Sequence, residues 1–246
     1  MTRMPPRDDL SLLLGGPSDE HILGASRGQN EGAITVVDYG AGNLRSVQRA
    51  LEAVGQRARL TSDSAEIDRA GGLVLPGVGS SNDAMKALHA LGLVEPLRAF
   101  AASGRPFLGV CLGLQLLYEW SEEGGGTDCL GVLPGPVRRF PDQPGLKVPQ
   151  IGWNAVRFTR PHPLREGIPD GTHFYFVHSY FAEPEPSITV GQAEHGVPFA
   201  AIVGRDNVAA TQFHPEKSAE LGLRVYANFA ALVRRHAERS EASRCA

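Results

Sequence analysis

A cysteine lies between two glycines in the sequence Gly109-Val110-Cys111-Leu112-Gly113. The short apolar run before it predicts a buried strand, and the apolar residues after it recur at helical spacing. This G-x-C-x-G spacing is typical of a nucleophile elbow, in which small flanking residues let the chain turn sharply from strand to helix. The helix terminus favours a thiolate. We predict that Cys111 is a nucleophile; the alternative is a buried cysteine that acts as a small apolar side chain.

A base for this thiol is expected in "TQFHPE", residues 211–216. His214 and Glu216 are two positions apart at the end of a predicted strand, so their side chains should leave the same face and the carboxylate can orient the imidazole. Pro215 cannot donate a hydrogen bond to a neighbouring strand. Alone, this pattern is also typical of an ordinary strand exit. Together with the elbow it predicts a Cys-His-Glu triad, in which His214 accepts the thiol proton and Glu216 fixes the tautomer.

Acyl chemistry at a thiol also needs hydrogen-bond donors for the oxyanion of the tetrahedral intermediate. The backbone N–H of Leu112, directly after the nucleophile, is one candidate. The second candidate is the N–H of Gly79, in the glycine loop Pro76–Gly79 that follows a neighbouring predicted strand. The alternative for this loop is a flexible strand exit.

Predicted strands and helices alternate up to about residue 130, which is typical of a mainly parallel sheet covered on both faces. The strands are expected at 33–37, 57–60, 72–77 and 106–110, and the helices after Asn43, at 63–70, at 81–103 and after Cys111. Later strands, between Pro and Gly turns, are expected at 136–140, 153–159, 173–182, 187–193, 198–204 and 207–213, before a final helix. The sequence therefore predicts a three-layer α/β fold with extra antiparallel strands in its C-terminal half.

We expect one domain over residues 33–237. Residues 1–32 lack sustained periodicity and predict a flexible extension, and residues 238–246 predict a polar tail that frays. The sequence Gly40-Ala41-Gly42-Asn43 begins like a dinucleotide-binding motif, but Arg45 stands where its third glycine would be. A tight turn with an asparagine cap is favoured over a nucleotide site.

The composition argues against several classes of protein. A formal net charge of −3 gives no sign of a nucleic-acid footprint. No apolar run approaches the roughly 20 residues of a membrane span, and no secretion signal is evident. Three cysteines are an odd number, which argues against a disulfide framework and for a reducing compartment. We therefore expect a cytoplasmic protein that binds neither nucleic acid nor membrane.

Six segments together closely resemble the class I glutamine amidotransferases, and among them the glutaminase subunits of imidazole glycerol phosphate synthase. They are "DYGAGNLRSV", "LPGVG", "GVCLGLQLL", "PQIGWN", "FVHSY" and "TQFHPEKS". The likeness covers about residues 33–235. It implies that Cys111 attacks the side-chain amide of L-glutamine, that His214 protonates the departing ammonia, and that water hydrolyses a glutamyl thioester. It implies no metal and no organic cofactor.

The same resemblance implies contacts with glutamine from Gln115, Glu123 and the backbone around Ser179 and Tyr180. Gln115 is four residues beyond Cys111 and thus on the same helical face, which makes its assignment geometrically sensible. For Glu123, in "SEEGGG", a solvated surface charge is the alternative. His178 lies in an aromatic strand and is expected only to pack and to form a hydrogen bond.

The family delivers ammonia to a (β/α)8-barrel synthase subunit, which makes imidazole glycerol phosphate and aminoimidazole carboxamide ribotide in histidine biosynthesis. Neither a phosphate-cradle motif nor a barrel is evident in the sequence, which fits an ammonia donor. The residues implied to face the partner are Asn43, Gln150, Trp153, Asn154 and Tyr175. The alternative for Trp153 is a core aromatic.

The chain departs from the family at Ser80-Ser81-Asn82, where a small residue and an aromatic are usual. The serines can cap the following helix, but the shape of the oxyanion loop stays open. Family behaviour implies that this loop rearranges when the synthase binds its substrate, so the isolated subunit should be a poor glutaminase. Two rival interpretations are the glutaminase subunit of pyridoxal phosphate synthase, which lacks "PQIGWN", and a silent scaffold, which is expected to have a broken triad.

Overall fold

The computed structural model describes residues 33–244, so the predicted extension at 1–32 lies outside the described residues. A nine-stranded sheet forms the centre of the domain, in the order β2-β1-β3-β4-β13-β12-β11-β8-β9. The first five strands in this order pair in parallel, and the remaining pairs are antiparallel. The bounds are β1 Ile34–Val37, β2 Ala58–Thr61, β3 Gly72–Gly77, β4 Phe107–Cys111, β8 Gln150–Phe158, β9 Thr172–His178, β11 Thr189–His195, β12 Val197–Arg205 and β13 Val208–Thr211.

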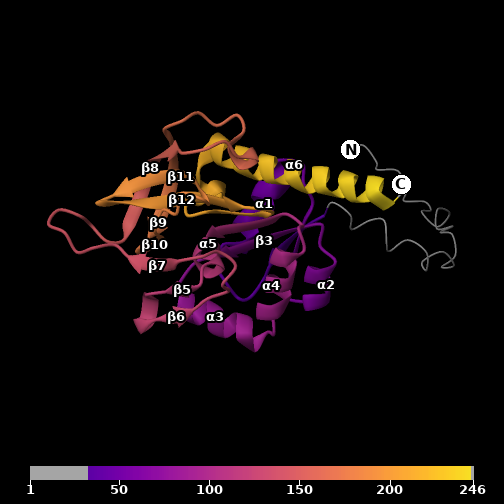
Figure 1. Ribbon diagram of the computed structural model, residues 1–246, viewed down its shortest axis with the longest axis horizontal. Coiled ribbons are helices and arrows are strands. Elements are labelled where there is room, and N and C mark those ends of the chain that lie inside the picture. The colour runs from indigo at the N-terminus through magenta and orange to yellow at the C-terminus, as the bar shows by residue number, and fades with distance from the viewer. Residues whose placement is uncertain (1–32, 245–246) are drawn as a thin grey trace, which may run out of the picture.

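Helices cover both faces of this sheet (Figure 1). The helices are α1 Leu44–Ala53, α2 Ser64–Asp68, α3 Ser81–Ala90, α4 Val94–Ala102, α5 Leu112–Leu117 and α6 Ala219–Arg244. Helices α1 and α6 pack in one apolar cluster and α2 to α5 in the other. Successive strand residues alternate between these clusters, as the two-residue period of a strand requires: Val74 faces α1 and α6, whereas Leu73 and Leu75 face the other layer. The predicted three-layer α/β fold is confirmed.

A second sheet of four short strands, in the order β10-β7-β5-β6, lies below the antiparallel half of the main sheet (Figure 1). Its strands are β5 Trp120–Ser121, β6 Thr127–Asp128, β7 Pro136–Arg139 and β10 Tyr180–Ala182. Three 3₁₀ turns complete the elements: η1 Glu123–Gly125, η2 Pro163–Arg165 and η3 Pro215–Lys217. The sequence analysis did not predict β5 and β6, because two-residue strands carry no periodicity.

Two helices differ from their predicted extent. The expected helix at 81–103 is divided into α3 and α4, because Gly92 adopts a φ of 65° that ends the first helix. At the other end of the chain, α6 continues through Arg244, so residues 238–244 are helical rather than an irregular tail. Among residues 33–244, no helix combines the length and the apolar character needed to cross a membrane.

Candidate active site

The chain turns at Cys111 in the way that a nucleophile elbow requires. Strand β4 ends at this residue, α5 begins at Leu112, and Cys111 has a positive φ of 55° with ψ at −108°. A positive φ is uncommon for a residue with a Cβ and marks a locally strained backbone. The flanking glycines permit the turn: a Cβ on Gly109 would lie 2.8 Å from the Gly113 carbonyl oxygen, and a Cβ on Gly113 would collide with the Leu75 carbonyl.

His214 and Glu216 form a buried pair beside this elbow. Nδ1 of His214 lies 2.7 Å from Oε1 of Glu216, and each side chain is only 1% exposed. The two side chains meet for a different reason from the one that the sequence analysis gave, which placed both of them on one face of a strand. Strand β13 has already ended at Thr211, and the 3₁₀ turn η3, which begins at Pro215, folds the carboxylate back onto the imidazole.

Two further side chains hold the Glu216 carboxylate. The Asn43 amide donates a hydrogen bond to Oε1, and the Tyr226 hydroxyl donates one of 3.1 Å to Oε2. Asn43, predicted to face a partner, occupies the N-cap position of α1 in a left-handed conformation, but its side chain makes no capping hydrogen bond and contacts the predicted triad instead. Tyr226 was not predicted, although a tyrosine between Val225 and Phe229 in an apolar helical stripe is a signal, because a buried hydroxyl needs a hydrogen-bond partner.

The electrostatics of the pair favour an imidazolium. Burial alone lowers the pKa of His214, but negative charge on the nearby Cys111 and the hydrogen bond with Glu216 outweigh it and raise the pKa to about 10. Burial alone would raise the pKa of Glu216, but its contacts with His214 and Tyr226 lower it. Nε2 of His214 is buried and has no hydrogen-bond partner among the described residues. It is therefore available to exchange a proton with the sulfur or a leaving group.

The glycine loop at the end of β3 lies next to the elbow at Cys111. Gly77 is the register partner of Cys111 in the parallel pairing of β3 with β4, and a Cβ on Gly77 would press on Leu112 at 3.0 Å. The Tyr39 hydroxyl donates a 2.9 Å hydrogen bond to the Pro76 carbonyl, which anchors the loop from the other side. The loop and the elbow are therefore neighbours, and the roles of Leu112 and Gly79 as oxyanion donors stay predictions.

Ser80 caps α3, as the sequence analysis predicted. Its hydroxyl accepts a 3.1 Å hydrogen bond from the Asp83 N–H, so the departure from the family at this position serves a helix start. Glu123 contacts the same helix start, because its Oε2 accepts a 2.6 Å hydrogen bond from the Ser81 N–H. The interpretation of Glu123 as a merely solvated charge is wrong.

The other predicted glutamine contacts meet through a residue that was not predicted, Gln212. The Gln115 amide donates hydrogen bonds of 2.8 Å to the Tyr180 carbonyl and 3.1 Å to Oε1 of Gln212. The Gln212 amide in turn points to Cys111, with Nε2 3.8 Å from Sγ. The carbonyl of Ser179 accepts a 2.9 Å hydrogen bond from Phe140. Gln212 lies within the motif that carries His214, so its proximity to the histidine was the available signal.

The predicted partner-facing residues divide into exposed and buried ones. Trp153 is 54% exposed on β8, so the alternative of a core aromatic is wrong, and its ring lies edge-on to Tyr175 at 6.3 Å on the neighbouring β9. Ile151, on the same strand, is 65% exposed. Asn154 donates a 2.8 Å hydrogen bond to the Glu194 carbonyl, and Gln150 is buried with an Oε1 that lacks a described partner.

Strand β9 joins this exposed surface to the predicted triad. The carbonyl of Tyr175 accepts a 3.0 Å hydrogen bond from the His214 N–H, and the Tyr175 N–H donates a 2.9 Å bond to the Ser218 hydroxyl. Within residues 33–244, no group of three or more His, Cys, Asp or Glu side chains is arranged to hold a metal ion.

Comparison with known proteins places the fold in a class. The sequence model of the family described as "Glutamine amidotransferase class-I" matches residues 35–232. A solved glutamine amidotransferase covers 81% of this chain and 98% of its own length, with a TM-score of 0.63 and 20% identity. The glutaminase domain of Trypanosoma brucei CTPS covers 82% and 94%, with a TM-score of 0.58 and 17% identity. At these identities the structures show a shared fold, which is that of the class I glutamine amidotransferases.

Sequence relatives identify the subfamily within this class. The imidazole glycerol phosphate synthase subunit HisH of Moorella thermoacetica is 52% identical over 202 residues, which are 82% of this chain and 95% of the relative. The subunit of the same name from Syntrophotalea carbinolica is 52% identical over 202 residues, 80% of this chain and 98% of the relative. The chain belongs to the class I glutamine amidotransferases and, within them, to the HisH subunits of imidazole glycerol phosphate synthase.

Proposed function

We propose that this chain hydrolyses L-glutamine to glutamate and ammonia through Cys111, His214 and Glu216. The Cys111 thiolate attacks the side-chain carbonyl carbon, and the N–H groups of Leu112 and Gly79 stabilise the oxyanion that forms. The imidazolium of His214 gives its proton to the amide nitrogen, the C–N bond breaks, and ammonia leaves a glutamyl thioester. Water then attacks the thioester while His214 accepts its proton, which releases glutamate and restores the thiolate–imidazolium pair.

The observation that carries this proposal is the state of His214. Its Nδ1 is held by a buried carboxylate at 2.7 Å, and its Nε2 has no hydrogen-bond partner among the described residues. The cysteine beside it has a positive φ. Such an arrangement keeps one imidazole nitrogen oriented and the other free for proton transfer. Gln115 and Tyr180 would bind the substrate, and Glu123 would shape the rim of the pocket through its bond to the first turn of α3.

We further propose that the ammonia passes to a (β/α)8-barrel synthase subunit in the cytoplasm, where the heterodimer makes imidazole glycerol phosphate and aminoimidazole carboxamide ribotide. The support is a surface on which Ile151 and Trp153 are exposed next to Tyr175, because large exposed apolar side chains that gather on one face are typical of protein interfaces. Asn43 and Asn154 would line the polar part of the same proposed interface, and the buried Gln150 would support it from below the surface.

The test measures glutamate release by this chain with a barrel synthase subunit and its ribulosyl substrate. We expect Cys111→Ala to abolish release, and Cys129→Ala to retain it, because Cys129 is the other described free and buried cysteine and takes no part in the site. Release that survives Cys111→Ala would overturn the nucleophile. Equal turnover with and without the synthase would overturn the expectation that the isolated subunit is a poor glutaminase.

A further inference from the structure

A cavity lies at the opposite end of β4 from Cys111. It has a volume of about 630 Å³ and is lined from the turn between β12 and β13, from the segments before β4 and after β8, and from α6. Pro106 lines it just before β4 begins, and Val208 lines it at the start of β13, whereas Cys111 ends β4. A strand of five residues separates the two sites, roughly 15 Å at the usual rise.

This cavity carries a surplus of positive charge. Arg160, Arg205 and Arg239 line it, and the only lining carboxylate among the described residues is that of Asp206, which is 3.8 Å from Arg205. Within residues 33–244, neither Arg160 nor Arg239 forms an ion pair. The whole chain has a net charge of −3, so this local excess of cations runs against its average composition.

Arg160 is anchored but incompletely satisfied. Its guanidinium donates to the Gly204 carbonyl and, at 3.4 Å, to the Ile188 carbonyl, which fixes it at the wall of the cavity. Its Nε is buried and has no acceptor among the described residues. A guanidinium that lacks a carboxylate partner is well suited to bind an anion.

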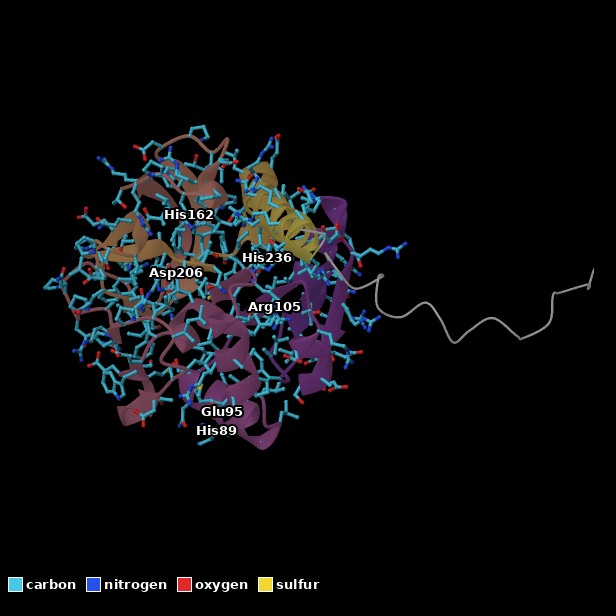
Figure 2. All side chains as sticks on the ribbon, turned by 45° about the vertical axis from the view of Figure 1, so that its right-hand side comes forward. His89, Glu95, Arg105, His162, Asp206 and His236 are labelled. Carbon is cyan, nitrogen blue, oxygen red and sulfur yellow. The ribbon has the colours of Figure 1, made fainter. Side chains whose placement is uncertain are left out.

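Two histidines add donors to the same cavity. Nδ1 of His162 accepts a 3.1 Å hydrogen bond from the Leu164 N–H, which leaves the proton of the neutral ring on Nε2 as a donor. Burial, followed by the charges of Arg239 and Arg105, lowers the pKa of His236. In Figure 2, His162 and Asp206 lie to the left of α6, His236 lies on that helix and Arg105 lies below it, whereas His89 and Glu95 lie at the bottom of the view.

We propose that this cavity binds a small molecule that carries a phosphate group. The two arginines without a carboxylate partner match the charge of a phosphate dianion, and guanidinium groups bind phosphate oxygens in a bidentate way. A volume of about 630 Å³ is typical of a site for a small organic ligand and exceeds the need of a single ion. The site is distinct from the proposed glutamine pocket, because the two lie at opposite ends of β4.

Calorimetric titration of the full chain with ribose 5-phosphate, at constant ionic strength, tests the proposal. We expect saturable binding that Arg239→Ala weakens about tenfold or more, since hydrogen bonds to charged groups are the strong ones. Arg234→Ala is the matched control, because Arg234 is an exposed arginine of the same helix that does not line the cavity. It should leave binding unchanged.

Three arms separate the possible outcomes. Inorganic phosphate should compete with ribose 5-phosphate, and bound phosphate should raise the pKa of His236 in an NMR titration. Arg160→Lys keeps the positive charge but loses the planar fork of donors, so it should weaken binding. Because a lysine can still donate to the Gly204 and Ile188 carbonyls, we expect this variant to stay folded. Absence of saturable binding, an equal loss in Arg239→Ala and Arg234→Ala, or equally tight binding of succinate would overturn the phosphate site.

Discussion

Two buried histidines show how strongly their surroundings decide their charge. His214 is 1% exposed and His178 is 7% exposed, yet the pKa of His214 is raised to about 10 and that of His178 is lowered to about 4. Burial favours the neutral ring at both positions. At His214 it is outweighed by a sulfur and a carboxylate, whereas His178 faces the Tyr180 carbonyl at 2.7 Å and the rings of nearby phenylalanines, with no carboxylate beside it to offset burial.

The comparison explains why one histidine suits proton transfer and the other does not. His178 packs among aromatic rings and holds the Tyr180 carbonyl, the same carbonyl that accepts the Gln115 amide. The expected packing and hydrogen bond of His178 are confirmed, and through this bond the neutral ring supports the proposed substrate pocket. The positive charge of His214 contributes to the lowered pKa of His178, so the charged site also helps to keep its neighbour neutral.

The largest expected effect comes from removing the carboxylate that distinguishes the two histidines. Glu216→Gln should bring the pKa of His214 down towards that of His178 and lower glutamate release by a factor on the order of 10⁴, because the imidazole loses its orienting anion. Glu220→Gln, an exposed position at the start of α6, is the control. An unchanged pKa of His214 in NMR would contradict our account of the pair.

The next largest effect is expected at acid pH, where His178 should lower the free energy of unfolding. Its pKa is about 4 in the folded chain against an ordinary 6.5, so the unfolded chain binds more protons between these values. The contribution of His178 to the free energy of unfolding is therefore fully present above pH 6.5. It falls as the pH drops towards 4, by about 3 kcal/mol at most. His178→Gln should flatten this acid limb in urea titrations. A limb of the same steepness in both proteins would contradict the assignment.

His214 should act in the opposite direction on the alkaline side. Because its pKa is raised, its contribution to stability is complete below pH 6.5 and is lost as the pH rises towards 10. In the Glu216→Gln protein, the free energy of unfolding should therefore depend less on pH over this range. The same urea titrations, continued to alkaline pH, provide the measurement.

The smallest effect is expected from the second anchor of Glu216. Tyr226→Phe removes a hydrogen bond of 3.1 Å and leaves a buried carboxylate oxygen unsatisfied, which should cost about 1–3 kcal/mol in the free energy of unfolding. Tyr118→Phe is a matched control, because the buried Tyr118 hydroxyl has no described partner and its loss should cost less. Equal losses in the two variants would show that the bond to Glu216 contributes nothing.

Local patterns predicted the parts of the site that depend on neighbouring residues. The glycines around Cys111 predicted the sharp turn, because only a missing Cβ allows the close backbone approach found at Gly109 and Gly113. Ser80 was predicted as a cap for the same kind of reason. The spacing of His214 and Glu216 predicted their contact, but through a strand geometry that the turn η3 replaces.

The sequence by itself determined most of the longer elements, their order and the short motifs, because each of these rests on the conformation of a few adjacent residues. Tertiary structure alone decided which distant side chains meet: Asn43 reaches Glu216 across 173 positions, and Gln115 reaches Gln212 across 97. It also decided that Trp153 is exposed and that unpaired arginines share a cavity at the far end of β4. These contacts depend on how the sheet and both helical layers pack, and no local pattern encodes that packing.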